Sequence, residues 1–158
     1  MAATMLEPDT ALVLVDLQKG ITALPTAHPA AEVVPGRTES GPSRPGPRPA
    51  DFAELAPGLG RTDDDIVVTK HTWGAFHGTD LDLRLRRRGV TQVVLGGIAT
   101  SIGVESTARA AYEHGYHVTV ATDAVTDMDP EAHRNSVERI FPRLGETGTA
   151  DELIALLG

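Results

Sequence analysis

QVVLGGIATSIGVESTARAAYEHG, residues 92–115, is the stretch that decides the fold. It opens with Val93-Val94-Leu95, a short continuous apolar run that is typical of a buried parallel strand. Gly96-Gly97 end that strand, and from Val104 onward apolar residues recur at helical spacing until Gly115 stops the helix. The stretch therefore predicts a strand, a tight turn and a helix in immediate succession.

The turn between this strand and this helix is the first candidate binding site. In open α/β sheets ligands bind at the carboxyl ends of the strands, and helix N-termini favour anionic groups. We therefore expect the backbone N–H groups of this turn to face a substrate. The predicted substrate-binding residues of the turn are Ala99, Thr100, Ser101 and Ile102.

Two ionisable residues directly follow other apolar runs. Ala11–Val15 ends at Asp16, and Ile66–Val68 is predicted as a strand that delivers Lys70. Taken alone, Asp16 is equally compatible with capping the next turn, and Lys70 with a surface position. Together at one sheet edge they favour acid–base chemistry, because a lysine beside a carboxylate keeps it ionised and orders its proton traffic.

Three further side chains are candidates for the pocket. Gln18 follows Asp16 closely, and either lines the pocket or hydrogen-bonds a loop. Trp73 and Phe76 follow Lys70 in a chain that is only 4% aromatic. Such rings suit a pocket wall around a small unsaturated or cyclic substrate, and they equally suit anchoring a loop in the core.

Other signals complete the expected alternation of strands and helices. Phe52 to Leu59 predicts a short helix or a turn, and Thr79 is expected to cap a helix that ends at Gly89. His117–Ala121 predicts a strand that ends near Asp123. Asp129 with Pro130 and the capping box Thr149–Glu152 each predict a helix start. The order predicts a doubly wound, Rossmann-like α/β domain: a parallel sheet flanked by helices.

GIATSIGVESTARAA, with Asp16 in ALVLVDLQ and Lys70 in IVVTKHTWGAFHGTDLD, resembles the isochorismatase-like hydrolase superfamily. The resemblance implies that Asp16 and Lys70 are catalytic and that Gly103 stands at the position of the nucleophilic cysteine of the family's amidohydrolases. It also implies that Asp123 shapes the fold around the site. The chain contains no cysteine at all.

The missing thiol limits the chemistry that the resemblance implies. Isochorismatases also have glycine at the position of Gly103, and their aspartate protonates a vinyl ether so that water can attack. For Asp16 to do this it must hold a proton near neutral pH. A hydroxyl of Ser101 or Ser106 is a weak nucleophile without a base in reach. We expect hydrolysis of a small carboxylate or vinyl-ether-type substrate without a covalent intermediate. The alternative is a catalytically silent family member that binds a ligand or forms oligomers.

The sequence departs from the family after Val34. Residues 35–49 hold five prolines and three glycines, which predicts a loop rather than a core element. Relatives have a helix and a strand here, so a helix–strand unit is apparently missing. Either the sheet closes with one strand fewer, or a partner chain fills the gap, or the sequence lacks residues. A sheet edge left open would be a pairing hazard.

Composition narrows the remaining classes. The 158 residues suit one domain, 1–158, and a net charge of −8 argues against nucleic acid or an anionic membrane as a partner. Without a long apolar stretch or a signal peptide, a cytoplasmic location is expected. Asp63-Asp64-Asp65 is interpreted as a charged turn, and His71 with His77 lacks zinc-ligand spacing, so no metal and no cofactor are expected. The resemblance implies a homodimer or homotetramer.

Overall fold

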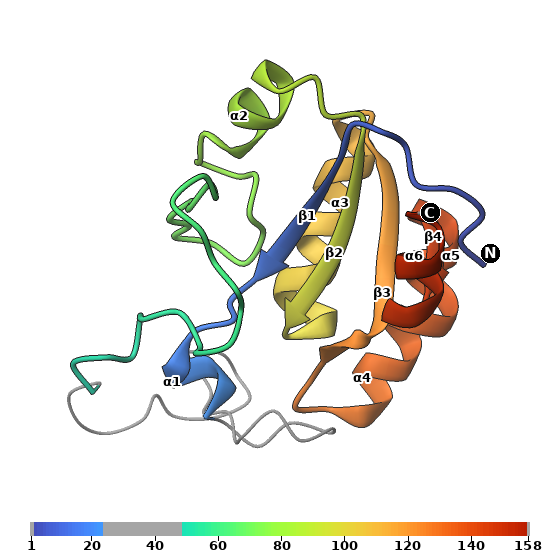
Figure 1. The fold of residues 1–158 in the computed structure, drawn as a ribbon. Coiled ribbons are helices and arrows are strands. Elements are labelled where there is room, and N and C mark those ends of the chain that lie inside the picture. The colour runs from blue at the N-terminus through green and yellow to red at the C-terminus, as the bar shows by residue number, and fades with distance from the viewer. Residues whose placement is uncertain (1, 24–48, 158) are drawn as a thin grey trace.

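The computed structural model describes residues 2–23 and 49–157. Residues 24–34 and the predicted loop at 35–49, except residue 49, lie outside the described residues. Figure 1 shows a parallel sheet with helices packed around it. The elements in chain order are β1 (Thr10–Val15), α1 (Lys19–Thr22), α2 (Leu81–Arg87), β2 (Gln92–Ile98), the π-helical turn η1 (Thr100–Val104), α3 (Glu105–Glu113), β3 (His117–Thr126), α4 (Pro130–Asn135), the π-helical turn η2 (Ser136–Ile140), α5 (Phe141–Leu144), β4 (Gly145–Gly148) and α6 (Ala150–Ala155).

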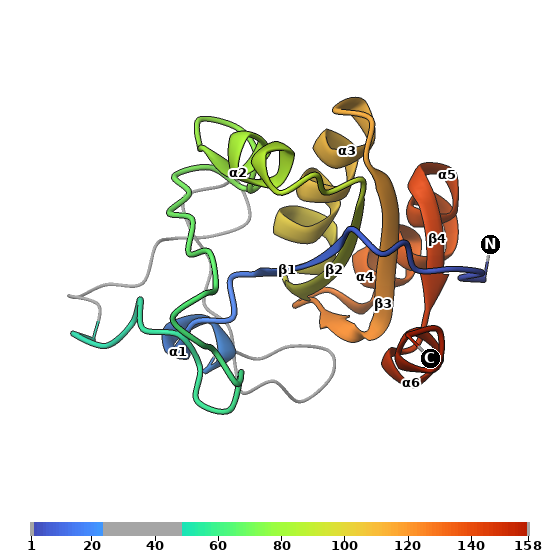
Figure 2. The same cartoon turned by 45° about the horizontal axis from the view of Figure 1, so that its top comes forward.

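The sheet confirms the predicted α/β class. Its four strands lie in the order β1-β2-β3-β4, and all three pairings are parallel. All seven residues of β2 are buried, as the continuous apolar run predicts. In Figure 2, α3 and α5 lie on one side of the sheet and α6 lies on the other. The carboxyl ends of β1, β2 and β3 therefore meet at one edge, which is the lower edge in Figure 1.

Most of the core lies between the sheet and α3. Val93, Leu95 and Val120 of the strands are fully buried, and so are Val104 and Ala108 of the following turn and helix. On the opposite face a smaller cluster forms where Leu153 of α6 packs near Val94 and Ala121. Leu12 and Leu14 of β1, on that same face, are 66% and 42% exposed.

Four helix boundaries confirm the sequence signals. The Asp129 side chain accepts hydrogen bonds from Glu131 N and Ala132 N at the start of α4, with Pro130 in the first turn. Thr149 and Glu152 form the complete capping box of α6. Gly115 has φ +81° and Gly89 has φ +70°, a backbone region that glycine enters without the cost of a Cβ.

One predicted element in the segment 49–78 is wrong. Ile66–Val68 is extended without belonging to a strand, whereas Phe52 to Leu59 forms turns, one of the two conformations expected there. A strand needs a neighbour to bond, and within the described residues β1 pairs with β2 alone. The segment before Lys70 therefore lies beside the sheet rather than in it.

The end of β3, the presence of β4 and the start of α2 also differ from expectation. β3 continues past Ala121 to Thr126, because a register shift against β2 loops residues 121–124 outward before pairing resumes at Val125. β4 was not predicted, since Gly145–Gly148 carries no apolar run. At α2 the residue flanking the helix is Asp80, although the Thr79 hydroxyl accepts a hydrogen bond from Leu81 N.

Candidate active site at the carboxyl edge

Asp16 and Lys70 meet at the carboxyl edge, as the sequence predicts. Lys70 Nζ lies 2.8 Å from Asp16 Oδ2, and the two side chains are 17% and 26% exposed. A second hydrogen bond, from Lys70 Nζ to Thr72 O at 3.0 Å, fixes the ammonium group. This partly buried ion pair leaves Asp16 Oδ1 as the atom that can take up a proton.

The backbone after β1 turns sharply to present Asp16. Its φ is +53°, the left-handed region that non-glycine residues enter rarely and aspartate tolerates better than most. The chain then folds back against the segment 52–56: Lys19 N donates to Glu54 O and Ala56 N donates to Leu17 O. Backbone strain of this kind gathers at functional sites, where the surrounding structure holds it in place.

Gly103 faces the Asp16 carboxylate. A Cβ built on Gly103 would lie 3.4 Å from Asp16 Oδ2, 3.4 Å from Ile98 O and 3.1 Å from Val15 Cγ1. Gly103 is buried, so a side chain there would point at the acid–base pair and not into solvent. The position where related amidohydrolases carry sulfur is therefore adjacent to Asp16 in this chain too.

The turn Ala99–Gly103 offers fewer backbone donors than the sequence suggests. Ile102 N and Val104 N both donate to Ala99 O, and Ser101 N donates to Asp127 Oδ2 at 2.6 Å. These three amides are occupied. Thr100 and Gly103 remain the candidate N–H groups of an anion cradle in this turn.

Asp127 is a buried carboxylate at this edge that sequence reasoning missed. It is 2% exposed and lies directly after β3. Its Oδ2 also accepts a hydrogen bond from Ser101 Oγ at 2.8 Å, and its Oδ1 accepts from Met128 N at 2.8 Å. The strand was expected to end near Asp123, so the pattern did not reach Asp127. Asp123 Oδ1 accepts from Ala150 N at the start of α6.

The side chain of Thr100, another predicted substrate-binding residue, bonds within the protein. Thr100 is fully buried, and its Oγ1 lies 2.9 Å from His133 Nδ1 of α4. Ala99, Ser101 and Ile102 are half-buried and stay candidates for substrate contact. Ser101 does have a carboxylate in reach, which the sequence did not reveal. That carboxylate already accepts hydrogen bonds from the backbone amides of Ser101, Met128 and Asp129.

The structure separates the remaining pocket candidates. Gln18 Nε2 donates to Ala53 O, so Gln18 bonds the loop. Phe76 is not a wall residue: it is 7% exposed and stacks against His114 with ring centroids 5.2 Å apart, in the core beside α3. Trp73 is 61% exposed close after Lys70 and remains a candidate for covering the substrate.

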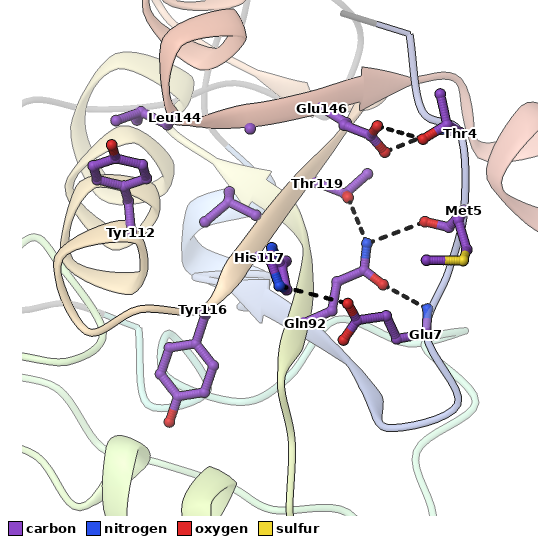
Figure 3. Close-up of a pocket in the computed structure, with 12 residues that line it drawn as sticks. Thr4, Met5, Glu7, Gln92, Tyr112, Tyr116, His117, Thr119, Leu144 and Glu146 are labelled. Carbon is purple, nitrogen blue, oxygen red and sulfur yellow. Dashed lines mark hydrogen bonds and ion pairs between the residues drawn. The ribbon is translucent and has the colours of Figure 1, made fainter.

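A second hollow lies at the opposite, amino edge of the sheet (Figure 3). It has a volume of about 300 Å³ and is lined by the starts of β2, β3 and β4 and by the N-terminal segment. Gln92 at its base is saturated: Oε1 accepts from Glu7 N and Thr10 Oγ1, and Nε2 donates to Met5 O and Thr119 Oγ1. These polar groups hold the N-terminal segment to the sheet.

Neither edge offers a metal site within residues 2–23 and 49–157, where no three His, Asp or Glu side chains gather closely enough to hold an ion. In the same part of the chain, no helix is long and apolar enough to cross a membrane.

The structure is thus an α/β domain with a parallel sheet and an Asp16–Lys70 ion pair at the carboxyl edge. The sequence matches the isochorismatase domain over residues 37–152, and the chain belongs to the isochorismatase family of hydrolases. An isochorismatase family protein from Burkholderia thailandensis has a similar structure, with 40% identity, a TM-score of 0.84 and 97% of each chain covered.

Two curated relatives extend the comparison. The uncharacterized isochorismatase family protein YwoC of Bacillus subtilis is 42% identical over 174 residues, covering 92% of each chain. That alignment is longer than the 158 residues of this chain, so YwoC has residues without a counterpart here. The ureidoacrylate amidohydrolase RutB of Methylobacterium radiotolerans is 41% identical over 91 residues, covering 57% of this chain and 35% of RutB.

Proposed function

We propose that this hydrolase cleaves a small carboxylate substrate with Asp16 as general base and Lys70 as its partner, without a covalent enzyme intermediate. The observation that carries the proposal is the 2.8 Å ion pair facing Gly103. A carboxylate in an ion pair accepts a proton rather than donating one. This favours activation of water by Asp16 over protonation of a vinyl ether.

The reaction balances with these groups alone. Asp16 Oδ1 takes a proton from water while the oxygen forms a bond to the substrate carbonyl carbon. The negative charge on the carbonyl oxygen is stabilised by N–H groups of the turn at Thr100 and Gly103. The bond from carbon to the leaving group then breaks, and the leaving group takes the proton back from Asp16.

The names of the relatives suggest which class of substrate to test first. RutB proteins are named for cleaving ureidoacrylate, a small carboxylate with a carbon–nitrogen bond next to a carbonyl group. A ureide or amide of this size is the first substrate to test. A vinyl ether such as isochorismate is the second, and it needs Asp16 in its protonated form.

Gly103→Cys and Gly103→Ala test the absence of a covalent step. Both variants add the same Cβ, which must displace Val15 Cγ1 slightly from 3.1 Å, and only the cysteine can attack a carbonyl. Intact-mass spectrometry during incubation with small amides, ureides and activated esters is expected to show an acyl adduct on Gly103→Cys alone.

An adduct on the wild-type protein would contradict the proposal, because it would reveal a nucleophile such as Ser101. The absence of an adduct on Gly103→Cys, with its fold intact by circular dichroism, would mean that the turn does not present a carbonyl to Asp16.

A further inference from the structure

We infer that Asp127 is a positioning residue of the hydrolytic site, and that it sets which amides of the Thr100–Val104 turn face the substrate. The inference deepens the proposed function and rests on it for its catalytic consequence. Asp127 bonds the turn after β2 from the end of β3, so it links two strands at the edge where Asp16 lies.

Asp127 is a buried charge held by hydrogen bonds alone. Its side chain accepts from Ser101 N, Ser101 Oγ, Met128 N and Asp129 N, and it is 2% exposed. No ion pair joins it to a cation among the residues that the structure describes. Burying a carboxylate without a cation is unfavourable unless its hydrogen bonds are complete. The Asp127 carboxylate therefore requires the Ser101 bonds, and loses much of its stabilisation if the turn shifts.

The bonds to Ser101 fix the orientation of the turn. Once Ser101 N–H points at Asp127, the peptide between Thr100 and Ser101 has one orientation, and the Thr100 carbonyl points the opposite way. On the other side Thr100 Oγ1 is held at 2.9 Å by His133. The turn is thus fixed at two successive residues, and it continues to Gly103, where an added Cβ would lie 3.4 Å from Asp16 Oδ2.

A matched pair of variants separates this role from general stability. Asp127→Ala removes both acceptor oxygens, so Ser101 N–H and Met128 N–H lose their partner. Asp123→Ala is the control: Asp123 lies on the same strand, and its carboxylate accepts from Ala150 N on α6.

Amide hydrogen exchange measured by NMR tests the link without any turnover. In Asp127→Ala we expect exchange at Ser101 to accelerate about tenfold or more, since a hydrogen bond to a charged group contributes that much. Exchange at Ala150 should stay unchanged. In Asp123→Ala the pattern should reverse, with faster exchange at Ala150 and unchanged exchange at Ser101. Equal exchange at Ser101 in wild type and Asp127→Ala would overturn the inference.

Kinetics on the substrate found for the wild type test the catalytic consequence. Misplaced amides weaken transition-state binding, so kcat is expected to fall about tenfold to a hundredfold in Asp127→Ala with KM little changed. Asp127→Glu, which restores an acceptor, should recover part of the loss. An unchanged kcat despite faster exchange at Ser101 would overturn the positioning role. A wild type without turnover would instead refute the proposed function, and the exchange result would still decide whether Asp127 fixes the turn.

Discussion

Polar and charged side chains gather at both the amino edge and the carboxyl edge of the sheet, but they differ in how they are hydrogen-bonded. At the amino edge Gln92, Glu7 and Thr119 bond one another, and the hollow between them is closed to further polar partners at its base. At the carboxyl edge the Asp16–Lys70 pair faces a glycine instead of a bonded neighbour. The polar groups around the amino-edge hollow thus hold the chain together, whereas the carboxyl edge carries a charged pair beside a glycine. A hollow by itself therefore does not identify a reactive site.

The largest expected loss of stability comes from replacing Gly97 at the carboxyl edge, and a glycine at the amino edge provides the control. Gly97, at the carboxyl end of β2, has φ +129°, and a Cβ there would lie 2.1 Å from the backbone oxygen of Val15. Gly97→Ala must push β1 from β2 beside Asp16, so we expect a loss of more than about 3 kcal/mol in unfolding free energy.

Gly115→Ala, before β3 at the amino edge, is the matched control. Gly115 has φ +81° with nothing within 4 Å of the added Cβ, so only the backbone cost of about 1 kcal/mol is expected. Urea unfolding followed by circular dichroism measures both. Similar losses in the two variants would contradict the close packing of β1 on β2.

Lys70→Met is expected to lower kcat/KM by about a hundredfold, because the Asp16 carboxylate loses its partner and its orientation. Lys19→Met is the control. Lys19 also pairs with a carboxylate, Glu54, at 2.5 Å, but on the surface near α1. Activity should be unchanged in that variant. Equal losses in both would mean that the carboxyl edge responds to charge in general and not to the Asp16 pair.

Some of the residues in this site could be predicted from the sequence, and others could not. Asp16, Lys70 and the turn at Gly103 were predictable because each follows an apolar run, and carboxyl ends of parallel strands share an edge. Asp127 was not, because the outward loop at residues 121–124 hides the last residues of β3 from a pattern search. Phe76 was placed in the pocket because its stacking on His114 is a long-range contact with no local signal.

The wrong strand at Ile66–Val68 has a different cause. Its local pattern is that of a strand, but strands form in pairs, and the described chain offers it no neighbour. Local propensity predicted the conformation, which is extended, and only the full topology decides whether it joins the sheet.

Tyr116, at the amino edge of the sheet, is expected to make the folded protein less stable at alkaline pH. Burial and the hydrogen bond to Asp82 raise the pKa of Tyr116 from 10.0 to about 12. The folded state thus holds this proton more tightly than the unfolded state, and its contribution is complete below pH 10 and is lost as pH rises toward 12.

The unfolding free energy should therefore fall by at most about 3 kcal/mol across that window. Tyr116→Phe should remove this slope, as measured by urea unfolding at several alkaline pH values. The same Tyr116 hydroxyl lowers the pKa of Asp82, so the stability that Asp82 adds above its ordinary pKa should also shrink in the variant. An unchanged alkaline slope would show that Tyr116 is not the titrating group.

The smallest effect is expected for Glu7→Gln. Glu7 pairs with His117 Nε2 at 3.6 Å, and His117 is 72% exposed, so the pair contributes little. We expect unchanged kcat and KM and a loss of less than about 1 kcal/mol in unfolding free energy. A substantial loss of turnover would show that the amino-edge hollow takes part in function.

Turnover of a panel of ureides, amides and vinyl ethers by wild type and Asp16→Asn, measured side by side, tests the central claim most directly. The account predicts that wild type hydrolyses at least one member of the panel, and that Asp16→Asn hydrolyses it at least about a hundredfold more slowly while still binding it. Equal turnover in the two proteins would contradict it, as would a wild type that binds these compounds tightly and releases them unchanged.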